Sequence, residues 1–238
     1  VAFTDTDVRV EKIKALRSLR VYTPSEAAAN FVRGQYGAGD DTHAYRNEDG
    51  VDPNSITETF VAAKLMFDNY RWSGVPFYVR TGKKLADKFT RIDVVFKKPL
   101  IDIFANPRMK SEQSLNSNVL TIFVEPNSGF SLRLNAKRAG QGFTTEPVDL
   151  KYLQSDEAKN ESPEPYERLF HDALEGNHTN FASWAEIAYA WKFVDVIRKL
   201  WDIEEPQFPN YTPGSMGPAA SDELLARDGR QWVYHLNH

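Results

Sequence analysis

Two lysines that follow a glycine at the end of a short apolar run are the residues of this chain best suited to chemistry with an anion. Residues 75–79 are mostly apolar and lead to Gly82, and Lys83 and Lys88 come next. Because glycine adopts backbone angles that other residues resist, Gly82 predicts a sharp turn at the end of a strand. Lysines on such a turn can contact a phosphate as point charges with three donors each. The same spacing is typical of a basic hairpin loop in solvent, and spacing alone does not separate these two interpretations.

Three glycines earlier in the chain are a second candidate for phosphate binding. Gly34, Gly37 and Gly39 stand in the order G-x-x-G-x-G, the reverse of the dinucleotide-binding order, and no helical pattern follows them. A nucleotide site needs its glycine-rich turn between a strand and a helix, because backbone amides must approach the pyrophosphate there. We therefore interpret the triplet as a glycine-rich strand exit and expect no nucleotide site in it.

The histidines show no recognisable catalytic or metal-binding pattern. The five are His43, His171, His178, His235 and His238. None belongs to an H-x-x-x-H pair or to a zinc-type spacing, so we expect no metal site. His171 and Asp172 could suggest an oriented general base, but adjacent residues on a helix point about 100° apart. We expect an exposed or capping role for this pair.

Composition narrows the class of protein. With 238 residues, 41% hydrophobic and 26% charged, the chain is expected to be soluble and globular, with one large core or two small ones. A net charge of -4 gives no general attraction for nucleic acid. No apolar run approaches the roughly 20 residues that cross a bilayer, and the first residues do not resemble a signal peptide. The absence of cysteine excludes disulfides and thiolate metal sites and fits a cytoplasmic location.

Helix signals stand at both ends of the chain. Thr4 and Asp7 predict a capped amphipathic helix over residues 4–19, and residues 23–26 read as a capping box with proline at the first helical position. Residues 165–174 form a short helical pattern before a glycine. Residues 183–186 are a second capping box, ahead of an apolar stripe in which we expect Trp184 and Trp191 to lie in the core. Ser221 is expected to cap a last short helix.

Strand signals dominate the middle. Alternation predicts strands over residues 57–67 and 91–96, and a strand pair over 118–124 and 130–135 flanks the hairpin signal at 126–129. Residues 148–153 predict one more strand. Both alternating sets of residues 57–67 are largely apolar, so both faces of that strand are expected to be covered. Short strands without intervening helices favour an α+β fold, with a large, mostly antiparallel sheet and helices packed on it.

Five ordered sequence blocks give the chain a family resemblance. They are W-x-G-V-P-F-x-x-R-x-G-K at 72–83, F-V-R-G-Q-Y-G at 31–37, P-E-P-Y-E-R-L at 163–169, N-F-A-S-W with A-W-K-F-V-D within 180–195, and G-S-M-G-P at 214–218. Together they resemble the C-terminal, substrate-binding and dimerisation domain of the glucose-6-phosphate dehydrogenase family, in a form similar to the bacterial enzymes. The resemblance assigns the whole of residues 1–238 to that domain. The dinucleotide-binding domain and the family's R-I-D-H-Y-L-G-K block, which carries its catalytic histidine, are absent from the sequence.

The resemblance implies that this chain is one domain of an enzyme whose catalytic and cofactor-binding residues lie in another. The family oxidises glucose 6-phosphate to 6-phosphogluconolactone, the first step of the oxidative pentose phosphate pathway, with NADP and in some members NAD. Lys83 and Lys88 match the family's substrate-binding lysines, whereas no catalytic or cofactor-binding residue falls in this chain, which is expected to hold no cofactor and to be inactive alone. Family members form dimers or larger assemblies in which the sheet makes much of the contact, so a homodimer through the sheet is implied. Eukaryotic members carry arginine where Met216 stands, in a block tied to a second NADP site, and we expect no such site here.

The role of Arg80 and the nature of the chain each leave two interpretations open at this point. Arg80 could pair with the phosphate bidentately or could fix the strand end by binding a nearby carboxylate or carbonyl, and we favour the second because the family's basic residues match the lysines. The chain itself is interpreted as part of a dehydrogenase. The alternative is a stand-alone sugar-phosphate-binding or assembly module without catalysis.

Overall fold

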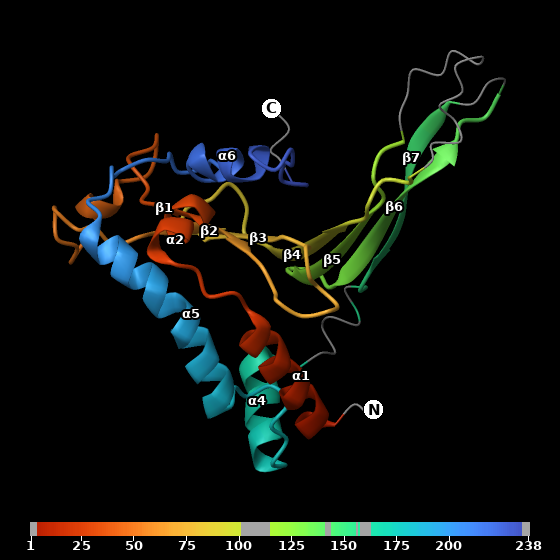
Figure 1. The fold of residues 1–238 in the computed structure, drawn as a ribbon, viewed down its shortest axis with the longest axis horizontal. Coiled ribbons are helices and arrows are strands. Elements are labelled where there is room, and N and C mark those ends of the chain that lie inside the picture. Colours follow the sequence, from red (N-terminus) through yellow and green to blue (C-terminus); the bar gives the residue numbers. More distant parts are fainter. Residues whose placement is uncertain (1–3, 101–114, 141–143, 156, 158–162, 235–238) are drawn as a thin grey trace. The chain divides into compact units, whose positions relative to one another are not determined.

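The computed structural model describes residues 4–100, 115–140, 144–155, 157 and 163–234. The chain divides into two compact units, unit 1 with residues 1–87 and 165–238, and unit 2 with residues 88–164 (Figure 1). Unit 1 carries the described helices and a three-stranded sheet, whereas unit 2 is built on a four-stranded sheet.

The helices of unit 1 start where local sequence signals predict them. They are α1 (Asp5–Ser18), α2 (Pro24–Asn30), α4 (Pro165–Leu174), α5 (Trp184–Ile203) and α6 (Ala220–Ala226), with a 3-10 turn at Tyr45–Asn47. The side chain of Thr4 accepts a hydrogen bond from the Asp7 amide at the start of α1. Capping boxes open α2 and α5, and both were predicted from the spacing of Ser or Thr and Glu. These three helix starts are confirmed.

The start of α6 differs from the prediction. Its N-cap position is Ala219, with no side-chain cap, and Ser221 lies inside the helix at 1% exposure. The chain already turns at Pro218, whose carbonyl accepts a hydrogen bond from the Ser221 amide. Because the turn begins before Ser221, the prediction that this serine caps the helix is wrong.

The sheet of unit 1 is covered on both faces, as predicted for its central strand. Strands β1 (Phe31–Gly34), β2 (Phe60–Leu65) and β3 (Phe77–Gly82) pair antiparallel in the order β1-β2-β3. On one face Ala63 packs in a cluster with residues of α2 and α5. On the other face Phe60 and Ala62 pack in a second cluster with residues of α6 and with Tyr211. This double coverage fixes β2, and the ends of its neighbours, inside unit 1.

The sheet of unit 2 has one apolar and one mostly polar face. Strands β4 (Thr90–Val95), β5 (Val119–Glu125), β6 (Gly129–Lys137) and β7 (Thr145–Leu153) pair antiparallel in that order. Register places apolar side chains in rows on one face: Ile92, Ile122, Phe130 and Tyr152 in one row, Val94, Leu120, Leu132 and Leu150 in the next, and Leu134 opposite Val148 beside them. The opposite face carries the ion pair between Arg133 and Asp149. The predicted hairpin joins β5 to β6 and is confirmed.

The α+β class is therefore confirmed, and every described strand pair is antiparallel. The predicted strands pair in two sheets, one in each unit, where the sequence suggested one large sheet. Alternation within a strand does not specify which strand lies beside it, because pairing depends on partners far away in the sequence.

The tryptophans of α5 contradict the sequence prediction. Trp184 is 81% exposed and Trp191 is 58% exposed, whereas Ile197 and Trp201 on the same helix are each 7% exposed. The residues that α5 contributes to a core cluster begin at Phe193 and include Ile197 and Trp201. The expected core position of Trp184 and Trp191 is wrong, because the core cluster covers α5 around Ile197 and Trp201 and leaves these two side chains mostly exposed among the described residues. A helix-period stripe predicts that a helix has a partner, and it does not say where the partner is.

None of the described helices is both long enough and apolar enough to cross a bilayer.

Candidate functional site

The candidate site begins where β3 ends. In the register of β3 with β2, Gly82 lies opposite Phe60, and the next amide, that of Lys83, donates to the carbonyl of Thr59 at 2.8 Å. The Lys83 side chain is exposed, and no described residue forms a hydrogen bond or an ion pair with its ammonium group. The backbone of Lys83 is therefore tied to β2, while its charge stays accessible to an anion.

A glycine is required at position 82 for a different reason from the predicted one. Its backbone does not lie in the left-handed region, but a Cβ there would stand 2.7 Å from Cδ2 of Phe60. Close packing against Phe60, not a turn at this residue, requires the glycine. The left-handed position is Lys84, with φ of 52°, so the turn falls two residues later than predicted. Left-handed conformations of residues other than glycine often occur at functional sites, where surrounding contacts hold them.

Residues 83–88 are named the lysine loop, and three further contacts hold it between Lys84 and Asp87, two at the backbone and one at a side chain. The Gly214 amide donates to the Lys84 carbonyl at 2.9 Å, and the Ala86 amide donates to the Ser215 carbonyl at 2.9 Å. The Tyr234 hydroxyl donates to the carboxylate of Asp87. Residues far away in the sequence therefore fix this loop, and a spacing argument along the chain could not have found them.

Arg80 has the role that we favoured for it. Its guanidinium donates to the Tyr234 carbonyl at 2.8 Å and lies over the ring of Trp232, 4.3 Å from the ring centroid. These contacts join β3 to the C-terminal segment of unit 1. Arg80 thus fixes the strand through a carbonyl, which confirms that prediction.

Lys88 is the first residue of unit 2, five positions after Lys83, and it precedes β4. Its side chain is exposed, and the described residues form no hydrogen bond or ion pair with its ammonium group. Whether Lys83 and Lys88 act on one anion stays a prediction.

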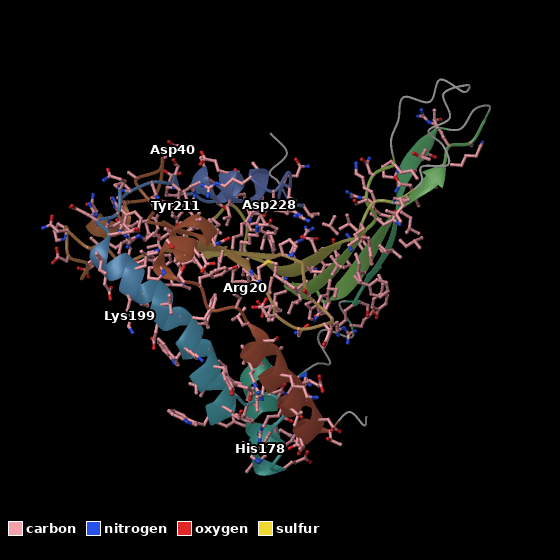
Figure 2. All side chains as sticks on the ribbon, in the orientation of Figure 1. Arg20, Asp40, His178, Lys199, Tyr211 and Asp228 are labelled. Carbon is pink, nitrogen blue, oxygen red and sulfur yellow. The ribbon has the colours of Figure 1, made fainter. Side chains whose placement is uncertain are left out.

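A charged pair beside β3 was missed by the sequence analysis. Asp228, labelled in Figure 2, forms a 2.6 Å ion pair with Lys64 of β2 and accepts from the hydroxyl of Tyr78 on β3. The Lys64 ammonium, and next the Tyr78 hydroxyl, hold the pKa of Asp228 below its ordinary value. Burial, and next the hydrogen bond to Asp228, raises the pKa of Tyr78 to about 12. The pair ties the segment after α6 to the sheet.

The glycine triplet and the histidines, which the sequence offered as further candidates, lie outside the lysine loop. Gly34 ends β1, and Gly37 and Gly39 pack against Pro209 and Pro213, so the glycine triplet is confirmed as a strand exit. The described residues contain no group of three metal-ligating side chains, and His235 and His238 lie outside them.

The acidic neighbour of His171 is placed differently from the prediction. His171 is exposed, as expected, but Asp172 is 7% exposed and accepts hydrogen bonds from the side-chain amides of Asn177 and Asn180. Its carboxylate fixes the connection from α4 to α5, so the expected exposed role is wrong for Asp172.

A hollow of about 310 Å³ between α1 and α5 includes residues such as Arg17 and Lys192 in its lining, but neither lysine of the candidate site.

Comparisons with known proteins agree with the resemblance. A family model described as "Glucose-6-phosphate dehydrogenase, C-terminal domain" matches residues 1–233. A glucose-6-phosphate 1-dehydrogenase of Bacillus subtilis is 46% identical over 230 residues, which cover 95% of this chain and 46% of that protein. The protein of the same name from Leuconostoc mesenteroides is 45% identical over 235 residues, 98% of this chain and 47% of its own length.

Solved structures show the same correspondence. The fold is similar to a glucose-6-phosphate dehydrogenase in complex with its substrate glucose-6-phosphate, with a TM-score of 0.83 and 29% identity over 98% of this chain and 47% of that one. The glucose-6-phosphate 1-dehydrogenase of Mycobacterium avium gives a TM-score of 0.76 at 27% identity, over all of this chain and 47% of that one. The chain spans about half the length of the relatives that it matches.

Proposed function

Because this chain belongs to the family of glucose-6-phosphate dehydrogenase C-terminal domains, we propose that it supplies the sugar-phosphate contacts and a subunit interface of an enzyme that oxidises glucose 6-phosphate to 6-phosphogluconolactone with NADP. The observation that carries this proposal is the lysine loop, whose backbone is held at residues 83–86 and whose Lys83 and Lys88 side chains are exposed within a family-matching stretch. We place the enzyme in the cytoplasm.

Lys83 and Lys88 are proposed to bind the phosphate of the substrate. Five peptide units span at most about 18 Å, and each lysine adds a long side chain, so both ammonium groups can reach one phosphate. A hydrogen bond to a charged group contributes roughly 1.5–3 kcal/mol, although exposure to solvent favours the lower end. Loss of one lysine is therefore expected to weaken binding by about tenfold or more. Binding energy from this non-reacting phosphate positions the reacting carbon.

The redox chemistry is proposed to lie in polypeptide that the relatives possess beyond the matched half. NADP bound there would supply the hydride acceptor for oxidation at C1 of the sugar, with the proton of the C1 hydroxyl taken by a base in that polypeptide, and NAD would supply the same acceptor chemistry. No residue of the present chain is assigned to that step. The chain alone is expected to bind the sugar phosphate weakly and to turn nothing over.

The exposed apolar surfaces of α4 and α5 support the proposal that further polypeptide packs against this chain. On α4, Phe170 is 70% exposed and Leu174 is 89% exposed, while Trp184 and Trp191 are exposed on α5. Large apolar side chains at helical spacing are expected to pack against another element. We propose that the additional half of the enzyme covers these surfaces.

The apolar face of the unit 2 sheet is proposed to be the homodimer interface. Most of its side chains are exposed in the single chain, with Leu150 at 54% and Tyr152 at 59%. A contiguous apolar face on an antiparallel sheet needs a cover, and a second copy provides an identical surface related by a two-fold axis.

Calorimetric titration with glucose 6-phosphate tests the proposed substrate contacts. Lys83→Gln and Lys88→Gln are each expected to weaken binding by about tenfold or more. Lys199→Gln, which removes an exposed lysine from α5 (Figure 2), is the control and should leave the affinity unchanged. The affinity of the wild type for glucose, which lacks the phosphate, should be no higher than the affinity of the variant with both lysines replaced for glucose 6-phosphate. Equal affinities for glucose and glucose 6-phosphate, or wild-type affinity in both variants, would contradict the proposal.

A further inference from the structure

Tyr211 is a buried titratable residue with a hydroxyl directed at the lysine loop. It is 7% exposed and lies in the core cluster with Tyr36 and Phe60, beside the sheet of unit 1 (Figure 2). Its hydroxyl oxygen is 2.8 Å from the Lys83 carbonyl oxygen and 2.9 Å from Oγ1 of Thr59. Packing alone would be satisfied by phenylalanine, so the hydroxyl needs a reason of its own.

The hydrogen positions follow from counting donors. A phenol has one proton, and burial raises the pKa of Tyr211, so the proton stays on at neutral pH. Thr59 Oγ1 accepts from the Tyr36 amide at 3.1 Å, which leaves its own proton for Tyr211. Tyr211 then donates to its shortest carbonyl contact, that of Lys83, rather than to the Thr59 carbonyl at 3.2 Å. The resulting chain of hydrogen bonds runs from the Tyr36 amide to the Lys83 carbonyl.

Both backbone polar groups of Lys83 are consequently held. Its amide donates to the Thr59 carbonyl, and its carbonyl accepts from Tyr211. The Gly37 amide in turn donates to the Tyr211 carbonyl at 2.8 Å, which anchors the tyrosine to the exit of β1. Tyr211 therefore connects the position of Lys83 to a core cluster of unit 1.

We propose that Tyr211 is a positioning residue for the phosphate-binding lysine, acting through the backbone of Lys83. This inference rests on the proposed function of Lys83. A lysine side chain is long and carries much rotamer freedom, so binding loses less entropy when the backbone beneath it is already fixed. Gly214 and Ser215, three and four residues after Tyr211, extend the hold to Lys84 and Ala86.

Tyr36 offers a matched control for a purely structural role. It is 5% exposed, belongs to the same cluster, and its ring centroid lies 6.3 Å from that of Tyr211. Its hydroxyl donates to Glu48 at 3.0 Å and makes no contact with the lysine loop among the described residues. Tyr36→Phe therefore removes the same atom from the same core without releasing Lys83.

The experiment compares Tyr211→Phe with Tyr36→Phe in two measurements. Amide hydrogen exchange is followed by NMR at Lys83 and Ala86, relative to amides of β2. Tyr211→Phe is expected to speed exchange at these two amides at least about fivefold, because the Lys83 carbonyl loses its hydrogen-bond donor. Tyr36→Phe should leave their exchange rates, relative to the amides of β2, nearly unchanged. Affinity for glucose 6-phosphate is expected to fall about threefold to tenfold in Tyr211→Phe alone.

The outcomes separate this inference from the proposed function. Equal exchange at Lys83 in the two variants overturns the inference, whatever the ligand does. A loosened loop that still binds glucose 6-phosphate with wild-type affinity overturns it as well. If the wild type binds no sugar phosphate while Tyr211→Phe selectively loosens the loop, the proposed function fails and the hold on the Lys83 backbone is supported.

Discussion

Replacement of Gly82 by alanine tests how the end of β3 is fixed. A Cβ at Gly82 would lie 2.7 Å from Cδ2 of Phe60 and 3.3 Å from the carbonyl oxygen of Thr59. The ring has little room to move, because Phe60 is 1% exposed and Gly217 packs so closely that a Cβ there would stand 2.3 Å from the ring. The added methyl group must therefore displace either the ring or the strand end.

The magnitude follows from two opposing contributions. Overpacking of a dense core costs about 1–3 kcal/mol of the free energy of unfolding. Alanine also restricts the unfolded chain more than glycine does, which returns about 0.4–1 kcal/mol. We expect Gly82→Ala to lower the free energy of unfolding by about 1–2 kcal/mol, and the melting temperature by about 2–8 °C, given about 2–4 °C per kcal/mol in a chain of this size.

Gly37→Ala is the matched control. The nearest atom to a Cβ at Gly37 is Cβ of Pro209 at 3.4 Å, an ordinary contact, and the backbone is not left-handed. This variant should gain about 0.4–1 kcal/mol through the unfolded chain. Urea denaturation followed by tryptophan fluorescence reports on unit 1, since all five tryptophans belong to it. A gain in Gly82→Ala equal to that in Gly37→Ala would refute the packing argument.

Three further predictions concern other parts of the molecule. Trp191→Gln should change the free energy of unfolding of the chain by no more than about 0.5 kcal/mol in urea denaturation, whereas Trp201→Gln, at 7% exposure, should cost about 3 kcal/mol or more; similar losses would contradict the exposed position of Trp191. The folded protein lowers the pKa of Asp228 from 3.8, so the ionised carboxylate stabilises the fold above about pH 4. This contribution to the free energy of unfolding is lost as the pH falls through the lowered pKa. Urea titrations from pH 6 to pH 2 should show a smaller loss of stability in Asp228→Asn than in the wild type, and equal losses would exclude the ion pair as a cause. Leu150→Glu on the apolar sheet face should convert dimers to monomers in sedimentation velocity, while Lys151→Glu on the opposite face should not; dimers that persist in Leu150→Glu would place the interface elsewhere.

Features determined by neighbours in the sequence could be predicted. The capping boxes at Thr23 and Ser183 depend on a polar side chain and a glutamate three residues later, and both form as expected. The strand exit at Gly34 and the exposed lysines after β3 likewise follow from a short stretch of chain.

Features determined by distant residues could not be predicted. Gly82 was assigned to a turn, because the contact with Phe60 that requires a glycine joins two strands. Tyr211 gave no signal at all, since its hydrogen bond to Lys83 spans 128 positions. Trp184 belongs to a stripe that is typical of a buried helix, yet it is 81% exposed, because residues far away in the sequence decide which part of α5 is covered.

The most direct test of the account is NMR of the lysine ammonium groups during a titration with glucose 6-phosphate. Binding of one phosphate by two lysines predicts that the Lys83 and Lys88 signals move together, with one dissociation constant, while Lys199 stays in place. Movement of only one of the two signals, or of neither while other lysines respond, would contradict the assignment of this loop as the sugar-phosphate site.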